Sequence, residues 1–172
     1  ERGAVTYRLL PVAQLLCSTG LAAGDAQHAR LLKAARHRLG SFLVSTVIAQ
    51  LARTPFSESW QVVSEHVGSL RTVVEHGTPQ AAAACARGLA RALSAFMEEK
   101  EAVEVLERVL ARTDLLELDR RRLLLQLTGI LGQRGQTGLA HQRLAEAQVR
   151  SMSRGLKAPL AEAPGLGEGF VH

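Results

Sequence analysis

The spacing of apolar and polar positions along the chain predicts helices throughout. Stretches of about 13–20 residues carry large apolar side chains three or four positions apart, as at Leu124, Leu127 and Leu131. A second stripe of this kind runs from Leu89 to Phe96. No segment has the strict alternation of apolar and polar residues that is typical of a half-buried strand. The chain is therefore predicted to be all-α.

Glycines, prolines and charge runs divide these stretches into eight predicted helices in four adjacent pairs. The pairs are 7–20 with 25–39, 41–53 with 57–76, 79–97 with 99–113, and 119–134 with 136–153. Connections of a few residues make the members of each pair antiparallel. Gly40 is expected to separate two of the helices, and Pro11 to kink the first helix or mark its start. Thr78 is expected to cap the helix that opens with Pro79.

The composition changes near the end of the chain. From about Ser153 onward, glycine, proline, alanine and glutamate predominate. Such a segment cannot bury enough apolar surface to fold alone. We therefore expect a helical domain over residues 1–153 and an extended or disordered tail over residues 154–172. No run of 18 apolar residues occurs, so membrane insertion is not expected.

Two of the predicted hairpins share a pattern of large and small residues. In the last pair, Thr128 on the first helix precedes Ala140 on the second by 12 positions. In the pair before it, Ala90 precedes Ala102 by the same 12 positions. Helices that cross closely require small side chains at the contact and large ones around it. The spacing thus predicts a repeated hairpin unit.

This pattern resembles that of the tetratricopeptide repeat family. The resemblance is clearest for residues 119–150, extends to 84–112 and is faint for 10–38, whereas residues 41–77 lack the pattern. It implies a right-handed solenoid of about four helical hairpins. Leucines replace the aromatic residues usual in the first helix, and the terminal proline is missing. The two clearest units are also offset by 38 positions, more than the family's period of about 34. A HEAT or armadillo type of hairpin repeat, and a non-repetitive bundle, remain as alternatives.

Little in the sequence points to catalysis. None of the six histidines is followed, three or four positions later, by a carboxylate or cysteine that would complete a metal site. Motifs for nucleotide binding, zinc-dependent hydrolysis or a nucleophilic serine are absent from the sequence. No enzyme activity, cofactor or metal is therefore expected. Cys17 and Cys85 do not form a disulfide framework, which favours reduced thiols and a cytoplasmic or nuclear location.

Charge is distributed unevenly along the chain. The formal net charge is +5, and arginine supplies nearly all of the positive charge. Residues 97–119 hold eight acids and three bases, whereas residues 120–154 hold seven arginines and one acid. Adjoining helices can neutralise each other through surface ion pairs of small value. The alternative is that arginines on one helical face form a recognition strip.

Five polar residues lie off the leucine stripes of the last two predicted pairs. They are Arg87, Arg91, Arg122, Gln126 and Gln133. In tetratricopeptide repeats such first-helix faces line a concave groove that holds a peptide or a partner's helix, so the resemblance implies a partner-binding role for them. Arginine donates paired hydrogen bonds to carboxylates, which predicts an acidic protein or peptide partner. The family's clamp for a terminal carboxylate uses asparagine, which this chain lacks.

The sequence therefore predicts a non-enzymatic protein-interaction module, such as an adaptor, a scaffold or a regulatory subunit of a larger complex. The alternative is a basic helical domain that binds nucleic acid or another polyanion, which an isoelectric point near 10.0 suggests. Three features speak against this alternative: few lysines, no aromatic residues between the basic ones, and the acidic block. The two hypotheses differ in how steeply binding falls with salt.

Overall fold

The computed structural model describes residues 26–152, and within this range all of its regular secondary structure is helical. The elements are α2 (Ala26–Leu43), the π-helical turn η2 (Val44–Ile48), α3 (Ala49–Leu51), the 3-10 turn η3 (Phe56–Glu58), α4 (Ser59–Val63), the 3-10 turn η4 (Ser64–His66), α5 (Val67–His76), α6 (Pro79–Ala95), α7 (Glu99–Leu110), α8 (Glu117–Gln133) and α9 (Thr137–Met152). The all-α prediction is confirmed for these residues. The predicted helix 7–20 and the predicted tail 154–172 lie outside them.

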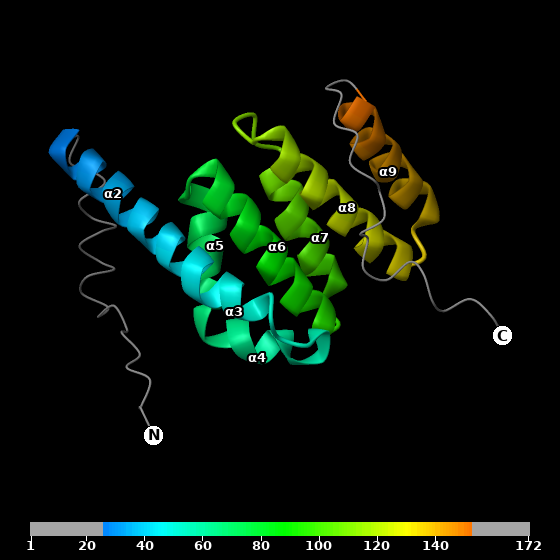
Figure 1. The fold of residues 1–172 in the computed structure, drawn as a ribbon, viewed down its shortest axis with the longest axis horizontal. Helices are drawn as coiled ribbons and strands as arrows, with labels where there is room; N and C mark the ends of the chain where they lie inside the picture. Colours follow the sequence, from blue (N-terminus) through cyan, green and yellow to red (C-terminus); the bar gives the residue numbers. More distant parts are fainter. Residues whose placement is uncertain (1–25, 153–172) are drawn as a thin grey trace.

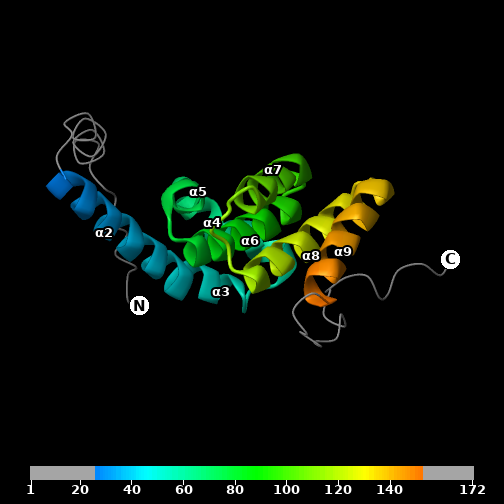
Figure 2. The same cartoon turned by 90° about the horizontal axis from the view of Figure 1, so that it is seen from above.

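Helix α6 is the centre of the molecule. The helices follow one another from α2 at one end to α9 at the other (Figure 1), and α6 packs against α2, α5, α7 and α8. Its buried residues are Ala82, Ala83, Cys85, Ala86, Gly88, Leu89, Ala90, Ala92, Leu93 and Ser94. All of them except the two leucines are small. Small side chains let neighbouring helices approach α6 closely on several sides. The view from above shows α5 and α7 on one side of α6, with α2 projecting at one end (Figure 2).

The predicted break at Gly40 is wrong. Helix α2 continues through η2 into α3, so the chain is helical from Ala26 to Leu51 without interruption. Gly40 is buried, and a Cβ atom there would lie 3.0 Å from the Cβ of Ala81 on α6. The glycine thus permits a close helix crossing instead of ending a helix. Eight helices in four pairs are accordingly not confirmed.

The predicted helix 57–76 is also divided. It contains two turns of 3-10 geometry, and α4 and α5 run in different directions (Figure 1). The backbone leaves regular α geometry at Val63 (φ −98°) and His66 (φ −112°). Val63 and Leu70 are both fully buried, one in each segment. The change of direction lets both α4 and α5 pack against α6.

The last four predicted helices are present, with ends that differ by a few residues. Helix α6 begins at Pro79, and the Thr78 hydroxyl accepts a hydrogen bond from the Ala81 N–H at 3.4 Å, as the capping prediction requires. The prediction that Phe96 continues the buried stripe of α6 is wrong. Phe96 caps the helix end, and 54% of the residue is exposed.

Two hairpins, α6–α7 and α8–α9, share their packing and their turns. The small residues of the predicted pattern are all buried: Ala90, Ala102, Thr128 and Ala140. At the first turn Met97 has φ of +67°, and the next N–H donates to the Leu93 carbonyl at 2.8 Å. At the second, 38 positions later, Gly135 has φ of +72°, and the next N–H donates across the same interval at 2.9 Å. Both turns are Schellman motifs.

Candidate binding surface

The five residues singled out by the sequence lie on α6 and α8, which pack against each other. Arg87 and Arg91 come from α6, whereas Arg122, Gln126 and Gln133 come from α8. The packing joins the two helices directly at one point, because the Gln126 amide donates a hydrogen bond to the backbone carbonyl of Arg87 at 2.9 Å. Segments separated by nearly forty residues therefore meet at this surface.

Arg87 and Arg122 form a cluster of like charge across α6 and α8. Partial desolvation lowers the pKa of Arg87, and the nearby positive charge of Arg122 lowers it further, while Asp119 acts in the opposite direction. Arg122 lies 4.0 Å from the Asp119 carboxylate. Within residues 26–152 the Arg87 guanidinium has no ion-pair partner within 4 Å. Two cations thus share a single carboxylate, which leaves capacity to bind an anion.

The two glutamines of the predicted site have different environments. Gln126 is half-buried and contributes its amide to the link with α6. Gln133 is exposed at the end of α8, roughly 10 Å further along the helix at 1.5 Å per residue. The structure therefore brings Gln126 next to the arginine pair and leaves Gln133 at a distance from it.

Arg91 has a structural role that the sequence did not reveal. Its guanidinium donates to the carbonyl of Leu51 at 2.7 Å and to the carbonyl of Thr54 at 2.6 Å. These carbonyls belong to the end of α3 and the turn after it, where helical carbonyls lack partners within the helix. Arg91 thus holds α3 against α6, and two of its N–H groups are engaged with backbone carbonyls rather than available to a partner.

A second arginine, Arg120, terminates α7 in the same way. Its guanidinium donates to the carbonyls of Leu110 and Arg112, at 2.7 Å and 2.5 Å. In the sequence, Arg120 is one of the seven arginines of the basic block 120–154. Arg120 lies in the first turn of α8, close in sequence to the end of α7. This position was the signal that its side chain can reach the carbonyls at that end. One member of the arginine run at 120–122 is thus committed to the fold.

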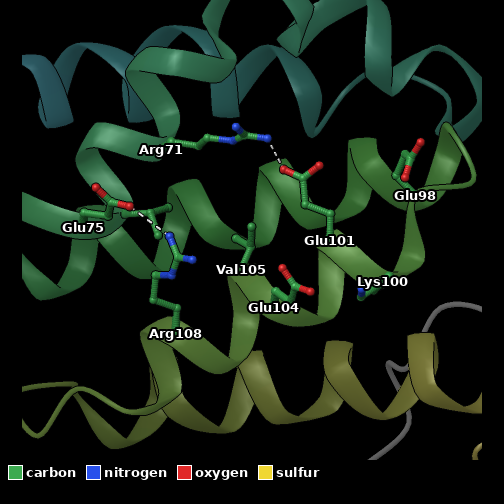
Figure 3. A pocket seen from close by; sticks show the side chains of 9 residues that line it. Arg71, Glu75, Glu98, Lys100, Glu101, Glu104, Val105 and Arg108 are labelled. Atoms are coloured by element: carbon green, nitrogen blue, oxygen red, sulfur yellow. Dashed lines mark hydrogen bonds and ion pairs between the residues drawn. The ribbon is translucent and has the colours of Figure 1, made fainter.

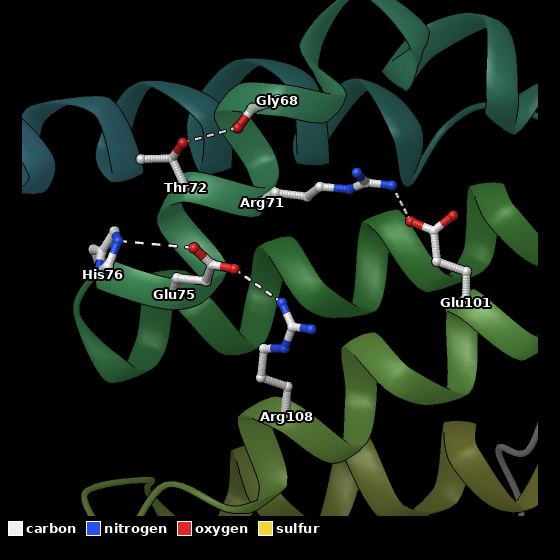
Figure 4. A network of polar contacts seen from close by, with 7 residues as sticks. All are labelled: Gly68, Arg71, Thr72, Glu75, His76, Glu101 and Arg108. Atoms are coloured by element: carbon white, nitrogen blue, oxygen red, sulfur yellow. Dashed lines mark hydrogen bonds and ion pairs between the residues drawn. The ribbon is translucent and has the colours of Figure 1, made fainter. Parts of the chain in front are cut away.

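A groove of about 460 Å³ lies on another face of the molecule, between α5 and α7, and the sequence analysis did not anticipate it. Its walls are mostly charged, as the side chains in Figure 3 show: Arg71, Glu75, Glu98, Lys100, Glu101, Glu104 and Arg108. Two ion pairs cross the groove and join the helices, Arg71 with Glu101 and Arg108 with Glu75 at 2.9 Å (Figure 4). Glu98 and Glu104 have no ion pair with any residue from 26 to 152.

The two charge blocks of the sequence meet at Arg122, which lies near Asp119, and at Arg143, which pairs with Glu107. Arg143 on α9 lies 3.2 Å from the Glu107 carboxylate on α7 and 3.3 Å from that of Glu146. One acid of the first block, Glu101, pairs instead with Arg71 on α5. Mutual neutralisation between the blocks is therefore only partial.

Neither a metal site nor a reactive thiol stands out in the described range. No group of three or more potential metal ligands comes together between residues 26 and 152. Burial of Cys85 in the core raises the pKa of its thiol to about 12, so it stays protonated at neutral pH. None of the helices in this range has the length and apolar character needed to cross a bilayer.

Comparison of the chain with protein-family models, with curated proteins and with solved structures found no match. The function of this all-α protein is therefore inferred from the geometry of its surfaces.

Proposed function

We propose that this chain is a non-enzymatic protein-interaction module that binds an acidic segment of a partner protein through Arg87 and Arg122. The observation that carries the proposal is the pair of guanidinium groups from α6 and α8, which have one carboxylate near them. Like charges brought together from two helices do not stabilise a fold. A carboxylate of a bound partner would relieve their repulsion and accept paired hydrogen bonds from each.

The architecture of the module is, in this proposal, a helical-hairpin repeat similar to the tetratricopeptide type. Support comes from two Schellman turns at Met97 and Gly135, which recur at the 38-position offset of the buried small residues. In repeats of this kind each hairpin packs on the next, and the first helices share one face. Helices α6 and α8 are the first helices of the two hairpins, and they carry Arg87 and Arg122 respectively. That shared face is the surface proposed to hold the partner.

Arg91 contributes to this function by positioning, because it fixes α3 against α6 beside Arg87. Gln126 acts similarly by joining α8 to the backbone of Arg87. The arginine pair is thus held on helices that are tied together, so little ordering entropy is lost when a partner binds. Gln133 would contact only a partner that extends along α8.

The test measures binding of a fluorescein-labelled peptide in which glutamates alternate with leucines, by fluorescence anisotropy. The double variant Arg87→Gln with Arg122→Gln should bind this peptide at least about 30-fold more weakly, as expected when a charge-paired partner is removed. The matched control is Arg71→Gln with Arg108→Gln, which removes the same charge from the α5–α7 groove. Its affinity should stay within about threefold of the original, since loss of exposed pairs has little effect.

A second arm addresses the polyanion alternative with a single-stranded oligonucleotide at several salt concentrations. The proposal fails if the two double variants weaken peptide binding equally. It also fails if the oligonucleotide binds tightly, with the steep salt dependence of phosphate neutralisation, while the peptide does not bind. Melting temperatures of both double variants verify that the fold is retained.

A further inference from the structure

An exposed apolar surface lies at the end of α6, apart from the arginine pair. Phe96 and Met97, at the turn into α7, are 54% and 78% exposed. The Phe96 ring stacks on the ring of Trp60 with centroids 4.7 Å apart and planes 15° from parallel. Phe56, half exposed, belongs to η3, which packs against α6. We call Phe56, Trp60, Phe96 and Met97 the Met97 patch.

Met97 has a backbone conformation that does not suit its residue type. Its φ of +67° lies in the left-handed region, which glycine enters without the clash that a Cβ atom causes. The corresponding turn at Gly135 uses glycine for this conformation. Because the Met97 side chain is exposed, it contributes no core packing that would offset the strain. The backbone hydrogen bonds of the Schellman turn hold Met97 in this conformation, and its exposed side chain is left available for a contact outside the chain.

Acidic side chains border this patch. Glu58 follows Phe56 closely in η3, and Glu98 and Glu99 follow Met97. Glu98 also lines one end of the α5–α7 groove, as Figure 3 shows, and Glu104 in the same groove is a further carboxylate without an ion pair among the described residues. Lys100 is the only cation among these residues beside the turn. The rim at the turn itself, residues 96–101, therefore holds three acids and one base, in contrast to the arginine pair on α6 and α8.

We propose that the Met97 patch binds an amphipathic segment of a partner protein in which apolar anchors are flanked by arginine or lysine. The anchors would cover Met97 and the Trp60–Phe96 stack, which are large, polarisable surfaces well suited to such contacts. The basic flanks would meet Glu58, Glu98 and Glu104. Exposed aromatic residues also insert into membranes, but an acidic rim repels the anionic lipids that attract peripheral proteins. The proposal does not depend on the function assigned to the arginine pair.

The decisive variants are Met97→Gly and Met97→Leu. Glycine removes the side chain and relieves the strain, so Met97→Gly should raise the melting temperature while weakening partner binding. Leucine keeps a large apolar side chain at the same strained position, so Met97→Leu should bind nearly as well as the original chain. A residue that served only the fold would not produce higher stability together with lower affinity.

The probe is a labelled helical peptide with leucines on one face and arginines on both flanks, measured by fluorescence anisotropy. A matched peptide carries glutamates in place of the arginines. We expect the basic peptide to bind at least about tenfold more tightly than the acidic one, and Met97→Gly to weaken it by about fivefold or more. Glu58→Gln combined with Glu98→Gln should weaken it further, while the control Glu107→Gln, whose carboxylate pairs with Arg143, should not.

Several outcomes would overturn the proposal. Equal binding of the basic and acidic peptides would contradict the role of the rim, and unchanged affinity in Met97→Gly would contradict the role of the patch. Binding to phosphatidylcholine–phosphatidylserine vesicles that is lost in Met97→Gly would assign the patch to a lipid surface instead. Concentration-dependent dimerisation that is lost in the same variant, measured by analytical ultracentrifugation, would assign it to a second copy of this chain.

Discussion

Replacing Arg91 by methionine should destabilise the fold, whereas the same change at Arg87 should not. The Arg91 guanidinium donates at 2.7 Å and 2.6 Å to two carbonyls, and the side chain is half-buried. The Leu51 carbonyl also accepts from the Thr54 N–H at 3.2 Å, so only the Thr54 carbonyl would lose its partner entirely. A hydrogen bond to a charged group contributes about 1.5–3 kcal/mol. We expect Arg91→Met to lower the free energy of unfolding by about that amount.

The assay is equilibrium unfolding in urea, followed by far-ultraviolet circular dichroism. Arg87→Met is the matched control on the same helix, one turn earlier. Its guanidinium has no ion-pair partner within residues 26–152, so the change should stay within about 0.5 kcal/mol. Arg91→Lys should fall between the two, because one ammonium group cannot reproduce the planar fork. Equal losses at Arg87 and Arg91, or none at Arg91, would refute the assignment of Arg91 to the fold.

Two further predictions concern the core. Gly88→Ala should lower the free energy of unfolding, measured in urea, by about 1–3 kcal/mol, because the new Cβ would lie 2.3 Å from the Cδ1 atom of Ile48. Adding Ile48→Val removes that Cδ1 atom and should restore part of the lost stability. In a Cys17→Ser background, Cys85 should react with a thiol reagent at pH 8 only as fast as the protein unfolds. Its burial raises the pKa from 9.0 to about 12, so the unfolded thiol ionises first and stability should fall as the pH rises above about 9.

Each of these predictions has a contrary outcome. Alanine has a higher helix propensity than glycine by about 1 kcal/mol, so a more stable Gly88→Ala variant would mean that the Ile48 side chain can move its Cδ1 atom aside at little cost. Rapid modification of Cys85 under native conditions would mean that the centre of α6 opens locally.

Local sequence signals determined the helical character of the chain and the boundaries of its second half. The Thr78–Pro79 start of α6 depends on side chains within a few residues, because a cap and its first N–H groups are neighbours in sequence. The 12-position spacing of small residues correctly marked buried positions in α6–α7 and α8–α9, since a hairpin brings its two helices together at fixed intervals. The stripes of leucine likewise marked part of the core, namely Leu89, Leu93, Leu124, Leu127 and Leu131.

Tertiary contacts decided the features that the sequence pattern misassigned. Gly40 and Gly135 are the same residue type, yet one lies inside a helix that crosses α6 closely and the other ends α8 with a positive φ. Only the position of α6 distinguishes them, because a Cβ atom at position 40 would crowd the Cβ atom of Ala81 on α6, about forty positions away in the sequence. Phe96 likewise continued an apolar stripe in sequence but lies beyond the helix end, where stacking on Trp60 replaces burial.

The candidate site divides in the same way. Composition and helical spacing determined that arginines occupy one side of α6 and α8, because residues four apart share a helix face. Which arginine has a free guanidinium was decided by the end of α3 and the turn after it, whose carbonyls accept from Arg91 and not from Arg87. A helix end presents these acceptors wherever the fold places it. The division between binding and structural arginines is therefore a property of the packed molecule and not of either helix alone.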